Sequence, residues 1–148
     1  MKGNLIELAE QGYFDVIIHG CNCFHTMGAG IALQIKRKYP TAYEADCILT
    51  NKGDRSKLGN YTWQRVQSIK TGKEFIIINA YTQFNYGSNT LDYEAVELVF
   101  SKIANAFPTE RIGYPKIGAG LAGGNWNKIQ KTINEKLIGC THTLVTLN

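Results

Sequence analysis

Hydrophobic and polar positions along the chain form patterns that predict strands and helices in turn. Asp15–His19 is a short, mostly apolar, β-branched run, which is typical of a buried strand. Glu74–Ala80 is nearly continuous apolar sequence, so both faces of this strand should be covered by other elements. Between them, Ile31–Tyr39 keeps apolar residues on one helical face and basic residues on the other. These three segments predict a layered arrangement of strands and helices.

The rest of the chain continues the same alternation. Tyr61–Ile69 alternates aromatic and polar residues, and Lys70–Lys73 predicts a hairpin turn into the apolar strand. Leu91–Ala106 has the apolar spacing of an amphipathic helix. The remaining expected elements are an edge strand or turn in Met1–Glu10, a helix from Ala42 to about Leu49 capped by Thr41, a strand at Arg111–Ile117, a helix at Asn125–Leu137 capped by Asn125, and a strand at Thr141–Leu147.

Strands that alternate with helices predict an α/β domain with a mostly parallel sheet and helices on both faces. We expect one domain over residues 1–148. Ligands bind outside the carboxyl ends of the strands in such sheets. Three polar or glycine-rich loops fall at predicted carboxyl ends, and they are Cys21–Gly30, Tyr81–Thr90 and Gly118–Gly124. The sequence therefore predicts a binding site on this rim.

Composition narrows the class of protein. Hydrophobic residues make up 44% of the chain and charged residues 19%, with a net charge of +4, which leaves no strong nucleic-acid signature. No apolar run approaches the roughly 18–20 residues of a membrane helix. Met1–Phe14 carries acidic residues where a signal peptide has its apolar segment, so we expect a cytoplasmic location. Cys21 and Cys23 lack a matching second pair, so we expect thiols without a metal.

The two glycine loops carry the clearest chemical signal. A strand, a glycine loop and a helix in succession can hold a phosphate, because the helix N-terminus offers unpaired N–H groups. Neither loop has the lysine of a Walker A motif, and the Gly118–Gly123 match to the dinucleotide pattern lies late in the chain. Two such loops on one rim suggest a diphosphate held from both sides, with a sugar attached. The alternative is that the glycines only form tight turns and permit close packing.

Candidate acid–base residues near the loops are few, and they are His19, His25, Asp92, Glu94 and Cys23. A histidine within a strand, such as His19, is more often a core residue than a functional one. The amide of Asn22 could hold a ribose hydroxyl, or it could shape a turn. Phe84 and Tyr86 could stack on a ribose or base, or could cover the core.

A set of motifs, in this order and spacing, runs through nearly the whole chain: Gly3–Leu5, Ile18–Asn22, Met27–Ala32, Asn79–Gln83 and Pro115–Trp126. They resemble those of the macro domain, a module that binds ADP-ribose. The resemblance is greatest to a short branch with the yeast-type ADP-ribose-1''-phosphate phosphatases, the terminal ADP-ribose–glutamate hydrolases, and phage and bacterial members. It implies a three-layer α/β/α sandwich around a mixed, mainly parallel sheet.

The resemblance also implies a site. ADP-ribose would lie on the rim, with Gly28–Ala32 at the diphosphate and distal ribose and Gly118–Gly123 closing over the diphosphate. The implied ligand-binding residues are Asn4, Leu5, His19, Gly28, Ala29, Gly30, Ile31, Ala32, Tyr81, Thr82, Gln83, Phe84, Ile117, Gly118, Ala119, Gly120, Leu121, Ala122 and Gly123. Asn22 matches the asparagine that holds the distal ribose, and His25 is the candidate acid or base.

The implied activity is hydrolysis of ADP-ribose-1''-phosphate or of another ADP-ribosyl bond, without a metal or cofactor. The alternative is a reader that binds ADP-ribose, or another nucleotide derived from NAD, without turnover. Expected partners are ADP-ribose or its conjugates, including ADP-ribosylated protein or nucleic acid, and no membrane. Four positions depart from the family pattern: Asn4 replaces an acid that meets adenine, His19 replaces an asparagine, and Thr82 and Ala122 replace a lysine and aspartate of the glutamate hydrolases.

Overall fold

The computed structural model describes residues 1–120 and 122–147. Within these residues, five strands form a single sheet in the order β2-β3-β1-β4-β5. Their bounds are β1 Val16–Cys21, β2 Tyr61–Gln67, β3 Glu74–Tyr81, β4 Arg111–Tyr114 and β5 Thr141–Leu144. β1 pairs in parallel with β3 and β4, β4 pairs in parallel with β5, and β2 alone runs antiparallel, against β3. The expected mixed, mainly parallel sheet is confirmed.

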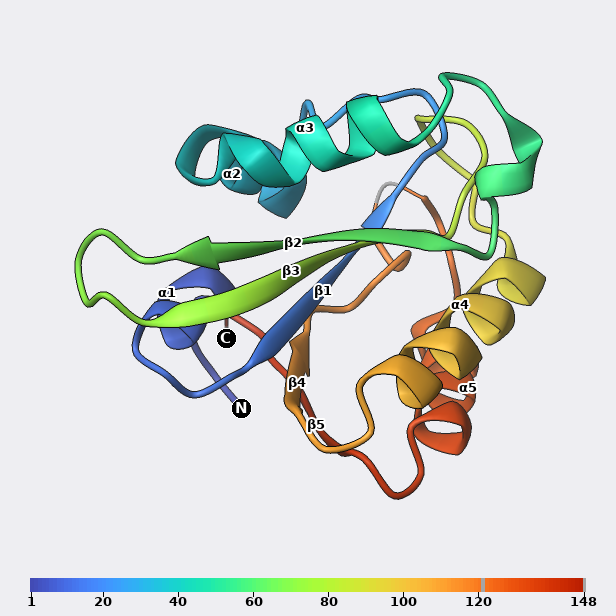
Figure 1. The fold of residues 1–148 in the computed structure, drawn as a ribbon. Helices are drawn as coiled ribbons and strands as arrows, with labels where there is room; N and C mark the ends of the chain where they lie inside the picture. Colours follow the sequence, from blue (N-terminus) through green and yellow to red (C-terminus); the bar gives the residue numbers. More distant parts are fainter. Residues whose placement is uncertain (121, 148) are drawn as a thin grey trace.

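Helices cover both faces of this sheet (Figure 1). Helices α4 (Tyr93–Ala106) and α5 (Trp126–Lys136) lie on one face, where α4 residues such as Val99 and Phe100 join Ile18 and Ile78 of the sheet in a buried cluster. Helices α1 (Leu5–Glu10), α2 (Gly30–Lys38) and α3 (Pro40–Leu49) belong to the opposite face. The result is the three-layer α/β/α sandwich.

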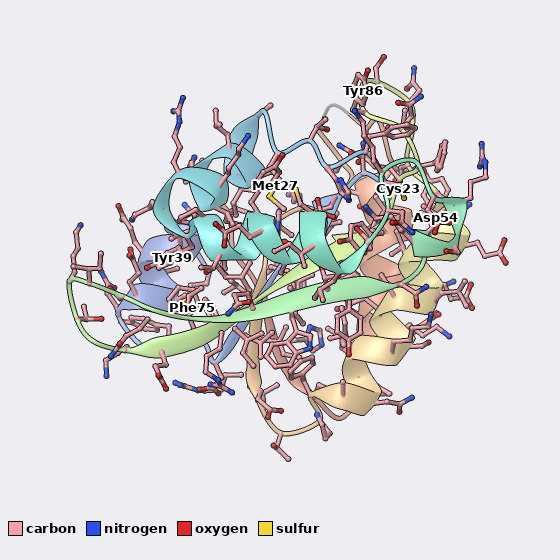
Figure 2. The ribbon with its side chains drawn as sticks, turned by 45° about the horizontal axis from the view of Figure 1, so that its top comes forward. Cys23, Met27, Tyr39, Asp54, Phe75 and Tyr86 are labelled. Carbon is pink, nitrogen blue, oxygen red and sulfur yellow. The ribbon has the colours of Figure 1, made fainter. Side chains whose placement is uncertain are left out.

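The apolar strand β3 is covered on both faces, as its sequence predicts. Phe75 and Ile77 pack in the cluster under α1, α2 and α3, and Ile76 and Ile78 pack in the cluster under α4 and α5. Figure 2 shows the edge-to-face pair of Tyr39 and Phe75, whose ring centroids lie 5.4 Å apart. Consecutive apolar residues therefore fill two separate cores.

Two predicted local features are wrong. The start of the chain folds as helix α1 and not as an edge strand, because the Asn4 side chain accepts a hydrogen bond from the Glu7 N–H and caps a buried apolar face. Only Lys2 keeps strand character, in an isolated bridge to Thr146. Helix α3 begins at Pro40, before the predicted cap Thr41, because proline suits the first helical position, where no N–H is needed.

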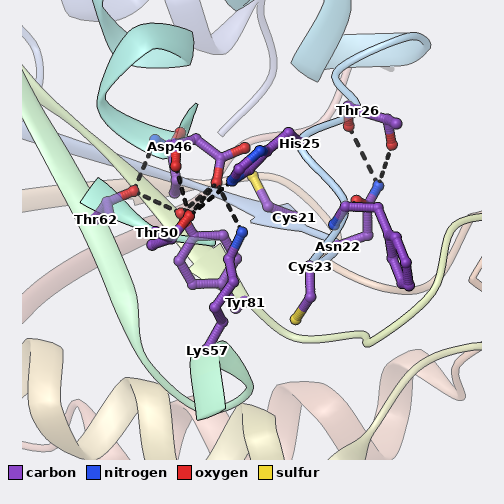
Figure 3. Close-up of polar contacts among 12 residues, drawn as sticks. Cys21, Asn22, Cys23, His25, Thr26, Asp46, Thr50, Lys57, Thr62 and Tyr81 are labelled. Atoms are coloured by element: carbon purple, nitrogen blue, oxygen red, sulfur yellow. Dashed lines mark hydrogen bonds and ion pairs between the residues drawn. The ribbon is translucent and has the colours of Figure 1, made fainter. Parts of the chain in front are cut away.

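A buried ion pair ties α3 to the sheet and to the short 3₁₀ segment Arg55–Lys57 (Figure 3). Lys57 Nζ lies 3.2 Å from Asp46 Oδ1, and the two side chains are only 3% and 2% exposed. The Tyr81 hydroxyl donates to the same carboxylate oxygen at 2.6 Å and also contacts Thr62 Oγ1 at 2.8 Å. Burial and the hydrogen bond to Asp46 raise the pKa of Tyr81, so its hydroxyl keeps the proton it donates.

No helix among the described residues is long and apolar enough to cross a membrane.

We predict that Lys57→Ala lowers the free energy of unfolding by about 3–5 kcal/mol, because it leaves the buried Asp46 carboxylate without its cation. Urea unfolding followed by circular dichroism would measure the change. Lys57→Met is the matched control, since it restores most of the side-chain volume but not the charge. Both variants should lose similar stability, and full recovery in Lys57→Met would show that packing, and not charge, is responsible.

Candidate functional site

Three adjoining cavities form one cleft at the carboxyl ends of the parallel strands. The Asn22 cavity has a volume of about 370 Å³, the glycine-loop cavity about 370 Å³ and the Asn4 cavity about 210 Å³. The Asn22 cavity is lined by Gly20, Cys21, Asn22, Thr26, Gly28, Ala29, Ala32, Gln83, Tyr86 and Gly87. The glycine-loop cavity is lined by Gly20, Ala29, Gly30, Ile31, Ala32, Gln83, Gly87, Pro115, Lys116, Ile117, Gly118, Gly120 and Ala122. The Asn4 cavity is lined by Gly3, Asn4, Leu5, Gly30, Ile31, Gln34, Pro115, Val145 and Leu147.

Shared lining residues show that these cavities adjoin one another. Ala29 and Ala32 line both the Asn22 and the glycine-loop cavities, and Gly30 and Ile31 line both the glycine-loop and the Asn4 cavities. The N-terminal turn of α2 therefore forms the middle of one long wall. Strand β1 delivers the chain to this wall, because it ends at Cys21, directly before the loop that leads into α2.

The N-terminus of α2 is built to receive an anion. Its N-cap residue is Ala29, whose side chain makes no capping hydrogen bond. The first N–H groups of a helix lack partners within it and carry a partial positive charge. Gly28 and Gly30 leave open space around the backbone, since a Cβ at either position would meet no atom within 4 Å. A phosphate could therefore approach these N–H groups closely.

The second glycine loop lies opposite, at the end of β4. Gly118 has φ +74°, and a Cβ there would come within 2.4 Å of Leu91 Cδ1, so only glycine fits without movement. The loop folds on itself through a bond from the Gly124 N–H to the Gly118 carbonyl at 2.7 Å. The Ala122 carbonyl accepts from the backbone N–H groups of Thr90 and Leu91, which anchors the loop to the segment after β3.

Asn22 lies at the far end of the cleft, and both ends of its amide are already engaged (Figure 3). Its Nδ2 donates to Thr26 Oγ1 at 2.6 Å and to the Thr26 carbonyl at 3.2 Å. Its Oδ1 accepts from the Phe24 N–H at 2.8 Å. Asn22 thus shapes the loop after β1 and lines the cavity at the same time, so the two sequence interpretations are not exclusive.

His25 does not line the cleft, contrary to the expectation that it acts there as an acid or base. Its ring contacts Thr50 Oγ1 at 3.0 Å, at the end of α3, and its carbonyl accepts from the Tyr43 hydroxyl at 2.9 Å. The residue adopts a left-handed backbone with φ +57°. This turn directs the side chain toward α3, and a sequence pattern does not reveal such a turn.

Three further expected ligand-binding residues do not line the three cavities, and their side chains are buried. His19 pairs with Asn79 Oδ1 at 2.7 Å, and Tyr81 reaches Asp46. Thr82 is buried, and its hydroxyl has no hydrogen-bond partner among the described residues. It lies under Gly20, where a Cβ would come within 2.9 Å of Thr82 Oγ1. Gly20 therefore lines the cleft and separates it from the Thr82 hydroxyl.

The segment after β3 contributes the expected Gln83 and the candidate aromatic residue Tyr86 to the cleft lining, but not Phe84. Gln83 lines two of the cavities, and its Nε2 donates to the Asn85 carbonyl and to Thr90 Oγ1, both at 3.0 Å. Phe84 packs edge-on against Phe24 under the Arg55 guanidinium and does not line the cleft. Tyr86 is the aromatic residue that lines it, with 61% of its side chain exposed (Figure 2).

The cleft lining therefore includes most of the expected ligand-binding residues. Those that the structure brings together are Asn4, Leu5, Gly28, Ala29, Gly30, Ile31, Ala32, Gln83, Ile117, Gly118, Gly120 and Ala122. Ala119 lines a neighbouring depression, and Gly123 supports the loop from outside the cavities. Leu121 lies outside the described residues. Pro115, Gln34 and Tyr86 are lining residues that the predicted set omits.

The cleft holds little charge. Among its described lining residues, Lys116 is the one Lys, Arg, His, Asp or Glu, and it belongs to the glycine-loop cavity. Burial raises the pKa of the Cys21 thiol well above its ordinary value, so that this thiol is not a thiolate at neutral pH. No three His, Cys, Asp or Glu side chains gather into a metal site in the described part of the chain. The cleft can hold an anion through backbone N–H groups.

Residues 18–133 match the family model described as the Macro domain. The chain belongs to this family. The match includes the end of β1, the uncapped start of α2 and the second glycine loop, which form the Asn22 and glycine-loop cavities.

Sequence relatives of this macro domain include an uncharacterized protein and two kinds of enzyme. An uncharacterized 17.5 kDa protein in the tk-vs intergenic region of enterobacteria phage T4 is 38% identical over 134 residues, which cover 88% of this chain and 83% of the phage protein. A DNA ADP-ribosyl glycohydrolase of Mycobacterium tuberculosis is 26% identical over 80% of this chain, which matches only 34% of that protein. An ADP-ribose 1''-phosphate phosphatase of Saccharomyces cerevisiae is 21% identical over 91% of this chain and 90% of its own.

Solved structures agree on the fold. A Bacteroides thetaiotaomicron protein of unknown function superposes with a TM-score of 0.79 at 24% identity, covering 98% of this chain and 94% of its own. The macrodomain of Thermus aquaticus DarG superposes with a TM-score of 0.75 at 22% identity, with the same coverage of 98% and 94%.

We predict that His19 makes the macro domain less stable as pH falls below the ordinary histidine pKa. Burial lowers the pKa of His19 below its ordinary value of 6.5, so the unfolded chain binds a proton that the folded chain does not. The free energy of unfolding should fall between about pH 7.5 and about pH 5.5, above the range where carboxyl groups titrate. Urea unfolding at several pH values would measure this slope.

His19→Gln should flatten that slope, since the glutamine does not titrate. His142→Gln is the comparison variant, because burial also lowers the pKa of His142, a less buried residue near the surface of β5. A slope that is the same in wild type and His19→Gln would contradict the role of His19.

Proposed function

We propose that the cleft binds ADP-ribose, with the base in the Asn4 cavity, the diphosphate between the two glycine loops and the distal ribose in the Asn22 cavity. The succession of three adjoining cavities along the N-terminus of α2 is the observation that supports this proposal. A diphosphate suits the middle section, because uncapped N–H groups of α2 face it and Lys116 adds a cation. The Asn4 cavity is mostly apolar, with Leu5, Ile31 and Val145 in its walls, as a flat base requires.

We further propose that the macro domain hydrolyses an ADP-ribose conjugate at the Asn22 end. A water would attack the anomeric carbon of the distal ribose or the phosphorus of a 1''-phosphate. The bond to the leaving group would break with its electron pair, and the leaving group would take up a proton. Rate enhancement would come from holding the diphosphate and ribose in place and from stabilising developing charge, since no lining residue is a ready general base. The yeast phosphatase and the mycobacterial glycohydrolase among the relatives support this class of reaction.

The second candidate is a reader that binds ADP-ribose without turnover. One observation favours it: His25 points to α3 and the Cys21 thiol is protonated at neutral pH, which leaves the Asn22 cavity without an obvious base. Both candidates require binding. Release of ADP-ribose from saturated protein therefore separates them, with the 1''-phosphate, glutamate-linked and base-linked DNA conjugates as substrates.

We predict that Asn22→Ala lowers turnover of the accepted conjugate roughly 100-fold, the usual effect of losing one positioned hydrogen-bonding group, because Asn22 Oδ1 can accept a second hydrogen bond from a ribose hydroxyl. Because the diphosphate site is separate, the dissociation constant for ADP-ribose should change less than tenfold. Single-turnover release assays and calorimetry would measure the two quantities.

Thr26→Val is the matched control for the loop, because it removes the hydroxyl that Asn22 holds at 2.6 Å while preserving side-chain shape. Turnover should persist in this variant if Asn22 acts on the ribose. An equal loss in both variants would mean that Asn22 only shapes the loop. Binding of ADP-ribose without release from any conjugate in the wild type would establish the reader.

We predict that Ala29→Asp separates stability from binding. An aspartate at this N-cap would stabilise α2, by about 1 kcal/mol, because it accepts a hydrogen bond that Ala29 cannot. The same carboxylate would occupy and repel the anion site, so ADP-ribose affinity should fall at least about tenfold. Calorimetry and thermal unfolding would report both effects.

Ala29→Ser is the control for Ala29→Asp, since serine caps a helix without adding charge. It should keep ADP-ribose binding and gain similar stability. Undiminished binding by Ala29→Asp would exclude the start of α2 as the diphosphate site.

A further inference from the structure

The hydrogen-bond polarity of Asn4 is fixed by the fold. Its side chain caps α1 by accepting from the Glu7 N–H at 3.1 Å. A backbone N–H can only donate, so the amide atom that faces it must be the oxygen Oδ1. The other amide atom, the nitrogen Nδ2, is then the one that remains free for other partners. None of the described residues accepts a hydrogen bond from it.

Asn4 also lines the cavity at that end of the cleft, so this fixed donor is part of the ligand site. The described lining of the Asn4 cavity contains no carboxylate. Its other side-chain amide belongs to Gln34, which is exposed and can turn either its oxygen or its nitrogen toward a ligand. The remaining side chains are apolar. They favour a flat ring but make no hydrogen bonds that would distinguish one base from another. Among these lining residues, Asn4 is thus the side chain whose hydrogen-bonding role toward a ligand, as a donor, is fixed.

A fixed donor matches an acceptor on the ligand. Adenine presents an amino group at position 6, which donates, while guanine and hypoxanthine present a carbonyl oxygen there, which accepts. We propose that Asn4 relaxes or reverses the selection for adenine, so that nucleoside diphosphate riboses with a 6-oxopurine bind at least as well as ADP-ribose. This inference rests on the proposed function, since it assumes that the base occupies the Asn4 cavity.

The test compares inosine diphosphate ribose with ADP-ribose by calorimetry, on wild type and on Asn4→Asp. Aspartate is as good an N-cap as asparagine, so the variant keeps α1, but its second oxygen accepts where Nδ2 donated. In the wild type, inosine diphosphate ribose should bind within about threefold of ADP-ribose or more tightly. In Asn4→Asp the ratio of the two dissociation constants should shift toward ADP-ribose by roughly tenfold.

Gln34→Glu controls for charge, since it adds a carboxylate to the same cavity on a side chain that is not locked by a cap. It should shift the ratio less than Asn4→Asp does. Two results would overturn this inference while leaving the proposed function intact. One is wild-type binding of ADP-ribose at least about tenfold tighter than inosine diphosphate ribose, and the other is a ratio of the two dissociation constants that does not change in Asn4→Asp. Failure of both nucleotides to bind would instead reject the proposed function, and the inference with it.

Discussion

Parallel pairing of β1 with its two neighbours is the constraint on which the rest of the structure depends. β1 pairs with β3 over its full length and with β4 near its start, and all three strands end on the same rim. A different wall of the cleft follows each strand: the loop into α2 follows β1, the segment after Tyr81 follows β3, and the second glycine loop follows β4. An antiparallel neighbour on either side of β1 would send one of these walls to the opposite edge. The site therefore exists because of the sheet topology.

The loop between β1 and α2 is further held in place by the buried polar side chains around Asp46. Asp46 binds Lys57 and Tyr81, and Thr50, the residue that follows the helix of Asp46, contacts the His25 ring. The Tyr81 backbone in turn pairs with Cys21, one residue before Asn22. His25 thus anchors the loop beside the cleft and does not enter it. Charges are buried on this side of the sheet, where they hold a loop, while the adjacent cleft lining stays nearly uncharged.

The sequence predicted the sheet, the helix faces and both glycine loops, because these depend on periodicity and on glycine, which are local signals. Helix α1 was missed although its signal is present. Asn4 is followed three residues later by Glu7, with the apolar Leu5 and Ile6 between them, and this pattern is a recognisable helix start. The direction of a loop side chain has no such signal. His25 turns away through a positive φ, and Tyr81 is drawn into the core by Asp46, a partner far away in sequence. For His19 a signal was present. Alternate residues of a strand point to the same face, so His19 lies on the same face as Ile17, which the helices cover.

The near absence of charge in the cleft has a consequence for how an anion would be held. Backbone N–H groups of α2 cannot be neutralised by pH and are fixed by the helix, so the diphosphate site would be rigid and insensitive to protonation. Lys116 would add one cation that salt can screen. Affinity would then depend weakly on ionic strength, unlike binding through a basic surface. With the anion held by the backbone, the side chains at the two ends of the cleft, Asn4 and Asn22, would be free to decide which base is accepted and whether the ribose reacts.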